Sequence, residues 1–261
     1  MHSNFLDRYI QGTSLVHKLD PRLKLVAALA FVLVATSAAP RAWPAFALLT
    51  LLALGAVIAA RIPIVVALKR SSIALPFAGM VALSLPFTRG GEVLWSWQPL
   101  GLSLAVTSEG LILFGAVLVK SWLSVLIVGL LIATTPFTQI IRAARALRLP
   151  AILSSTISFM YRYLFVLVDE ASRLMTARAA RSVGSGRTMW WRARVLGGMV
   201  GSLFIRSYER SERIYAAMLS RGFAGEMRSM AVLAWERRDT WIGLLWAVLL
   251  AAVAAVGWFL L

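Results

Sequence analysis

Residues 110–134 read GLILFGAVLVKSWLSVLIVGLLIAT, an apolar stretch interrupted by a single charged side chain, Lys120. A helix needs about 20 mainly apolar residues to cross the hydrocarbon core of a bilayer, with a range of about 17–25. The stretch meets that length. Over the whole chain, 60% of the 261 residues are hydrophobic, well above the roughly 45–50% of soluble domains. The sequence therefore predicts an all-α integral membrane protein.

Four further apolar stretches bring the predicted number of transmembrane helices to about five. They cover residues 23–39, 42–60, 71–88 and 240–261. Pro76 and Pro86 lie in the third of the five spans and predict a kink or a frayed end there, because proline lacks an N–H and clashes with the preceding turn. The aromatic belts typical of membrane interfaces are represented near the span ends by Trp43, Trp95, Trp97, Trp241 and Trp258.

Positive charge is concentrated between the fourth and fifth predicted spans. The formal net charge of +16 could by itself indicate nucleic-acid binding. However, seventeen of the 27 Lys and Arg residues lie between Thr135 and Thr240, next to uncharged spans. That pattern is typical of a cytoplasmic region under the positive-inside rule, and a basic face beside anionic lipid explains much of it. We therefore expect a multi-pass protein of the bacterial inner (cytoplasmic) membrane, with a cytoplasmic N-terminus, a periplasmic C-terminus and no nucleic-acid partner.

The basic connection is too long and too patterned to be a linker. It divides the chain into residues 1–134 with the N-terminal segment and four spans, 135–239 with cytoplasmic or interfacial helices, and 240–261 with the last span. The helices are predicted near residues 138–147, 151–182 and 199–221, with a break at Gly184-Ser185-Gly186. Their apolar stretches of about 11–13 residues favour buried or interfacial helices over spans.

Two short motifs end the long basic helices: Ala180-Arg181-Ser182 and Ser220-Arg221-Gly222. One interpretation is simple capping, because arginine in the last turn complements the helix dipole, at about 0.3–1 kcal/mol, and glycine commonly follows a helix. The alternative is that small neighbours leave each guanidinium free to enter a groove of a partner, where its planar fork binds carboxylates or carbonyls.

Catalytic and metal chemistry find little support in the composition. The chain has no cysteine, and its two histidines, His2 and His17, precede the first span; no catalytic residue, metal site or cofactor is predicted. An intramembrane enzyme remains a rival hypothesis, without a His-Glu-x-x-His motif to support it. No cleavable signal peptide is evident. Lys120 is either a functional charge within a span or a side chain that snorkels or pairs with a carboxylate.

The chain resembles a known family: the transmembrane, or T, components of energy-coupling factor (ECF) transporters, and among them the CbiQ-type subunits of cobalt importers. The resemblance follows the order and spacing of motifs along nearly the whole chain. They are SLVHKLDPRLKL at 14–25, TTPF at 134–137, AARALRLP at 143–150, FMYRY at 159–163, Asp169-Glu170, the motif around Arg181, and AMLSRGF at 217–223.

The resemblance implies membrane helices plus a coupling domain of three helices in a non-catalytic transporter subunit. It implies that Ala180, Arg181, Ser182, Ser220, Arg221 and Gly222 bind two ABC ATPase subunits that are CbiO-like. It also implies that the first coupling helix, with Phe137, Ile141 and Arg145, packs against a CbiM-like membrane substrate-binding subunit, which can come with a small CbiN-like subunit. Ser182 stands where glycine is common in the family, a mild departure.

Cobalt uptake is the function that the resemblance favours. T components of nickel or biotin systems, and T components shared among several vitamin-binding partners, are similar. A conventional ABC permease would also bind an ATPase, but through one coupling helix per subunit, whereas two arginine motifs on one chain favour a single subunit that touches two ATPases.

Overall fold

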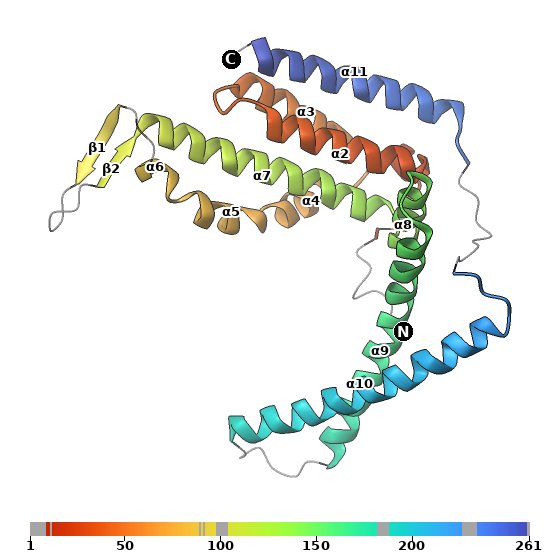
Figure 1. Ribbon diagram of the computed structural model, residues 1–261. Coiled ribbons are helices and arrows are strands. Elements are labelled where there is room, and N and C mark those ends of the chain that lie inside the picture. The colour runs from red at the N-terminus through yellow and green to blue at the C-terminus, as the bar shows by residue number, and fades with distance from the viewer. Residues whose placement is uncertain are drawn as a thin grey trace. The chain divides into compact units, whose positions relative to one another are not determined.

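The computed structural model describes residues 9–10, 12–88, 90, 92–97, 104–181, 188–225 and 234–259. Their backbone contacts divide the chain into two compact units (Figure 1). The bundle unit comprises the described residues up to Ala143 together with those of the C-terminal helix. The basic unit comprises the described residues from Ala144 to Gly225.

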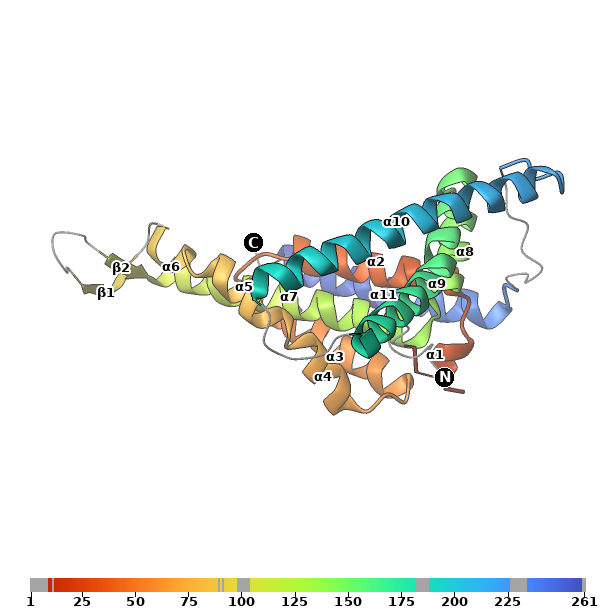
Figure 2. The ribbon, with the colours of Figure 1, turned by 90° about the horizontal axis from the view of Figure 1, so that it is seen from below.

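The bundle unit is built around four helices that run side by side (Figures 1 and 2). These are α2 (Pro21–Ser37), α3 (Trp43–Ala59), α7 (Ser108–Thr134) and α11 (Arg237–Phe259). The remaining bundle elements are α1 (Leu15–Lys18), α4 (Ile64–Ser71), α5 (Ala74–Ala82), α6 (Leu85–Thr88), β1 (Val93–Trp97), β2 (Leu104–Thr107) and the first residues of α8 (Phe137–Ala146).

Local sequence explains where the principal helices begin. Asp20 caps α2 by accepting a hydrogen bond from the Arg22 N–H at 2.7 Å, and Pro21 occupies the first turn, where its missing N–H costs nothing. Thr107 caps α7 in the same way, accepting from the Gly110 N–H at 3.3 Å. Gly110 is required there, because an added Cβ would lie 2.6 Å from the carbonyl oxygen of Leu85.

Small and branched side chains fill the centre of the bundle unit. Phe31, Leu49 and Leu123 are fully buried between the helices, and alanines such as Ala53 allow the close approach of the backbones. The outer face is also apolar: Leu33 of α2 is 68% exposed. A helix that is apolar on its buried and exposed sides alike is typical of a membrane span. The chain is thus a multi-pass membrane protein.

Four helices of the described chain are long and apolar enough to cross a membrane. They are α7, α11, the broken segment Ile64–Thr88, and α9 (Ala151–Arg181). Three of these correspond to predicted spans. The predicted spans 23–39 and 42–60 appear as α2 and α3, each with 17 residues, at the lower end of the spanning range of about 17–25. A buried or interfacial helix was expected at the position of α9, which the structure shows to be long and apolar enough to cross a membrane.

The predicted span 71–88 is not one continuous helix. It is divided between the end of α4, the whole of α5 and the whole of α6, and both α5 and α6 pack against α7. Pro76 and Pro86 each lie in the first turn of a new helix, the position in which proline is tolerated. The predicted interruption is therefore confirmed, and proline chemistry explains it.

A two-stranded antiparallel hairpin, β1 and β2, connects α6 to α7. It adds a small β element to the predicted all-α fold. Its register shifts between Val93 and Trp95 as at a β-bulge. Trp95 and Trp97, predicted to flank spans, belong to β1.

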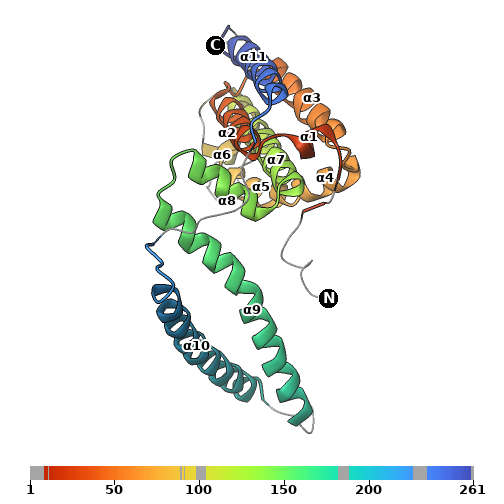
Figure 3. The same cartoon turned by 90° about the vertical axis from the view of Figure 1, so that its right-hand side faces the viewer.

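The basic unit consists mainly of two long helices, α9 and α10 (Met189–Leu219), which pack against each other (Figure 3). The predicted helix 199–221 begins ten residues earlier than expected. Gly197 and Gly198 lie inside it, with nothing within 4 Å of the position that a Cβ would take. Each glycine costs about 1 kcal/mol relative to alanine but does not break the helix. The predicted break at 184–186 lies outside the described residues.

Candidate functional site

The end of α10 holds Arg221 in a defined geometry. The Gly222 N–H donates to the Leu219 carbonyl at 2.9 Å, and the Phe223 N–H donates to the Met218 carbonyl at 3.0 Å. Gly222 has φ +78°, the left-handed conformation that glycine adopts without strain. This pair of bonds is a Schellman motif, so the predicted capping role of Gly222 is confirmed. Arg221 is the last residue before the chain reverses.

Both motif arginines are exposed. Arg181 is the last residue of α9, next to exposed Ala180, and Ser182 lies outside the described residues. Ser220, Arg221 and Gly222 are likewise exposed. Within the described ranges, neither Arg181 nor Arg221 forms a hydrogen bond or an ion pair with another side chain.

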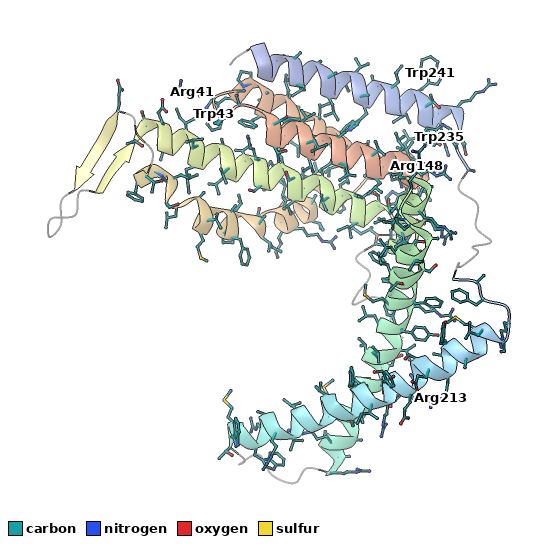
Figure 4. The ribbon with its side chains drawn as sticks, in the orientation of Figure 1. Arg41, Trp43, Arg148, Arg213, Trp235 and Trp241 are labelled. Atoms are coloured by element: carbon teal, nitrogen blue, oxygen red, sulfur yellow. The ribbon has the colours of Figure 1, made fainter. Side chains whose placement is uncertain are left out.

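Other arginines of the same two helices are engaged inside the unit. Arg206 of α10 pairs with Glu170 of α9 at 3.1 Å, and Arg213 lies 3.9 Å from Glu209, the i,i+4 neighbour on its own helix. The Arg178 guanidinium is 5.9 Å from the centre of the Trp191 ring. Figure 4 shows Arg213 on α10. Arg206 and Arg178 therefore connect α9 to α10, whereas Arg213 pairs within its own helix.

The predicted stripe on α8 is only partly accessible. Phe137, Ile141 and Arg145 follow one another at four-residue steps, which places them on one face of the helix. Ile141 is 7% exposed, and Phe137 and Arg145 are half-buried. Arg148, just beyond the helix, has φ +77° and closes a second Schellman motif, in which the Leu149 N–H donates to the Ala144 carbonyl at 3.0 Å. Arg148 is labelled in Figure 4.

A buried polar network that was not predicted joins one end of the bundle unit. Asp239, at the start of α11, is 1% exposed, and its two carboxylate oxygens accept the backbone N–H groups of Asp20 at 3.3 Å and Glu236 at 2.9 Å. The Lys24 ammonium group donates to the carbonyl oxygens of His17 at 3.1 Å and Thr134 at 3.3 Å. The network therefore ties together the start of α2, the end of α7 and the start of α11.

Several residues of this network belong to the sequence motifs described above, although no role in a network was predicted for them. Asp20 and Lys24 belong to the 14–25 motif, and Thr134 begins the 134–137 motif. Asp239 carried no signal, because it lies 219 positions from Asp20.

Lys120 has a structural role in α7. Its ammonium group donates to the carbonyl oxygens of Thr36 at 2.8 Å and Ala38 at 2.6 Å. These carbonyls lie at the C-terminal end of α2, where the helix dipole favours a cation. The ring of Phe46 lies 5.9 Å from the same ammonium group. Helix-end carbonyls, rather than a carboxylate, therefore satisfy this charge.

The bundle unit differs at its two ends. Arg41 and Trp43 lie at one end, and Trp235 and Trp241 lie at the other (Figure 4). Trp43 is 46% exposed and Trp241 is 72% exposed, as the aromatic belts of a membrane protein require. At the first end, Arg41 pairs with Glu109 at 2.6 Å. The second end holds the buried polar network and the starts of α2 and α11, with Arg22, Arg237 and Arg238.

A multi-pass helical bundle with a basic unit whose two long helices end at exposed arginines defines a helical membrane protein. A family profile described as CbiQ, cobalt transport protein, matches residues 12–231. The chain belongs to this family, as a non-catalytic transmembrane component of ECF transporters.

Several relatives match most of this chain. The energy-coupling factor transporter transmembrane protein EcfT of Listeria innocua is 29% identical over 95% of this chain and 96% of its own length. EcfT of Bacillus subtilis is 27% identical over 100% of this chain and 99% of its own. An uncharacterized protein of Methanocaldococcus jannaschii is 28% identical over 86% of this chain and 76% of its own.

Proposed function

We propose that this chain is the coupling subunit of an ECF-type cobalt importer, and that Arg181 and Arg221 anchor two ATPase subunits. The observation that carries the proposal is the exposure of two guanidinium groups at the ends of α9 and α10, neither of which pairs with a carboxylate of the described residues. Removing a guanidinium that occupies a desolvated groove of a partner can weaken the binding free energy by about 2 kcal/mol or more.

Mechanical coupling follows from anchors at the ends of rigid helices. When ATP binding closes the two ATPase subunits toward each other, the two helix ends held in their grooves move together. Each of the two helices has 31 residues, so a displacement at one end is carried along the whole helix. Helices joined to them then tilt or slide, and a membrane substrate-binding subunit that rests on the same scaffold is reoriented.

The exposed apolar face of the basic unit supports the presence of that second partner. Large apolar side chains along α9 and α10 are far more exposed than a soluble helix pair would leave them. They are Met160, Leu164, Val168, Met175, Val200, Phe204 and Ile205. We assign these exposed side chains to contact with a CbiM-like substrate-binding subunit and the surrounding lipid. On α8, we assign Phe137, Ile141 and Arg145 to contact with the same kind of subunit.

The ATPase anchors can be tested by charge reversal with a matched control. Arg181→Glu plus Arg221→Glu should reduce the recovery of ATPase subunits in a detergent pull-down by at least about tenfold, the equivalent of about 1.4 kcal/mol. Arg173→Glu plus Arg194→Glu makes the same charge change on exposed positions of the same two helices and should leave recovery unchanged. Undiminished recovery with the first pair would refute the anchoring role.

We further propose five membrane spans, with the basic unit and the N-terminus in the cytoplasm and the C-terminus in the periplasm. The end of the bundle that carries Arg22, Arg237 and Arg238 is the more basic one, as the positive-inside rule requires of the cytoplasmic side. Because the chain has no cysteine, Ala180→Cys and Gly90→Cys can each be labelled alone. A membrane-impermeant maleimide added to intact spheroplasts should label Gly90→Cys only. Labelling of Ala180→Cys instead would overturn the topology.

Cobalt is the proposed cargo because the family is described as one of cobalt transport proteins. The complex purified through this chain should contain a CbiM-like subunit, and cells that depend on it should take up radioactive cobalt. Uptake of nickel or biotin instead, or recovery of several different vitamin-binding subunits, would support the alternatives.

A further inference from the structure

A groove of about 370 Å³ lies between α9 and the end of α10. Its lining combines aromatic and aliphatic side chains with two arginines. These residues are Phe159, Arg162, Tyr163, Ile214, Ala217, Met218, Arg221 and Phe223. Its volume lies in the range of about 300–1,000 Å³ typical of ligand pockets.

The floor of the groove is held in place by contacts within the basic unit. The Phe159 ring stacks on Tyr163 at 6.4 Å between centroids and meets Phe223 edge-on at 6.2 Å. The Ser155 hydroxyl donates to the Gly225 carbonyl at 3.4 Å, which ties the segment after α10 to α9. The groove therefore exists before a partner binds, so that binding costs little ordering of side chains.

The charged side chains that line the groove are all positive. Arg162 and Arg221 are both exposed, and no carboxylate of the described chain lines the groove or pairs with either of them. A guanidinium binds a carboxylate through two parallel hydrogen bonds, and aromatic rings bind apolar side chains. The matching occupant is a protein segment that presents a carboxylate beside an apolar side chain.

We propose that this groove receives such an acidic, apolar segment of the ATPase subunit that Arg221 anchors, and that Arg162 is a second contact residue. The inference rests on the proposed function, because Arg221 belongs both to the anchor and to the groove. In this arrangement each partner inserts into the other: Arg221 enters the ATPase, and a segment of the ATPase enters between α9 and α10.

Two pairs of variants test the groove in the full-length chain. Arg162→Glu reverses one of its charges, and Arg173→Glu makes the same change on α9 outside the groove. Ala217→Phe fills the groove without changing charge, and Ala216→Phe places the same ring on the adjacent exposed residue, which does not line it. We expect Arg162→Glu and Ala217→Phe each to weaken ATPase binding by about tenfold in detergent, and the two controls to stay within about twofold of the unmodified chain.

The outcomes separate the groove from the anchor. If Arg221→Glu weakens ATPase binding while Arg162→Glu and Ala217→Phe do not, the groove proposal is wrong and the proposed function stands. If none of the three variants weakens binding, both are wrong. If Arg162→Glu spares ATPase binding but reduces flotation of the purified chain with vesicles containing phosphatidylglycerol, the groove binds lipid headgroups and the proposal is overturned.

Discussion

Both units contain long helices, but they differ in how many side chains of these helices are buried. In the bundle unit, side chains such as Phe31 and Leu123 are fully buried among neighbouring helices. In the basic unit, Ser154 and Ser155 are the buried residues of α9, and no described residue of α10 is buried. The bundle therefore contains its own core, whereas the basic unit presents its surfaces to other molecules. Substitutions in the first should change stability, and substitutions in the second should change association.

The sharpest test of this difference compares two leucines. Leu123 of α7 is fully buried, and Leu164 of α9 is 40% exposed. Leu123→Ala should lower the unfolding free energy by about 2–4 kcal/mol, because it leaves a cavity as well as removing contacts. Leu164→Ala should lower it by less than about 1 kcal/mol. Equilibrium unfolding in mixed micelles measures both, and equal losses would show that the basic unit also has a core of its own.

The buried polar network should come next in size. Asp239→Asn replaces a carboxylate that accepts two backbone N–H groups by a side chain with one acceptor oxygen and an NH₂ group. A hydrogen bond to a charged group contributes about 1.5–3 kcal/mol, so we expect a loss of about 2 kcal/mol. Asp169→Asn, on the exposed face of α9, is the control and should change stability by less than about 0.5 kcal/mol. Faster hydrogen exchange at the start of α11 in Asp239→Asn alone would place the effect at the network.

Features that depend on a local sequence pattern could be predicted, whereas contacts between distant residues could not. The span 110–134 agrees with α7 to within two residues at its start, because an uninterrupted apolar run is a local signal. The i,i+4 pair of Glu209 and Arg213 was likewise predictable from spacing. The pairing of Glu170 with Arg206, the hairpin, and the bond between Asp20 and Asp239 were not, since each joins residues that no local pattern relates.

The arginine-rich groove illustrates the same limit. Apart from Ile214, its residues come from two of the motifs, 159–163 and 217–223, and no sequence pattern measures the space between two helices. The positions of Arg181 and Arg221 at helix ends could be predicted. Their lack of internal partners required the structure.

Backbone strain at helix ends provides a finer comparison between the units. Arg61, after α3 in the bundle unit, has φ +54°, and Arg148, after α8 in the basic unit, has φ +77°. A left-handed conformation costs a side-chain-bearing residue about 1 kcal/mol or more, and glycine adopts it freely. Arg61→Gly and Arg148→Gly should each raise the unfolding free energy by up to about 1 kcal/mol. The flexibility that glycine adds to the unfolded chain reduces this gain. Thermal unfolding measures the gain. A loss on Arg148→Gly alone would mean that its side chain makes a compensating contact in the basic unit.

The smallest expected effect concerns the charges along α10. Glu209 and Arg213 are 57% and 69% exposed at their side chains and lie 3.9 Å apart, so solvent screens their attraction. Glu209→Gln should therefore change stability by no more than about 0.5 kcal/mol. Glu170→Gln should cost more, because the Glu170 side chain is 22% exposed and bonds to Arg206 across the two helices at 3.1 Å. Amide hydrogen exchange along α9 and α10 measures both. If the two variants loosen the helices equally, the ion pair between Glu170 and Arg206 contributes no more than the exposed pair within α10, and the other contacts between α9 and α10 hold the two helices together.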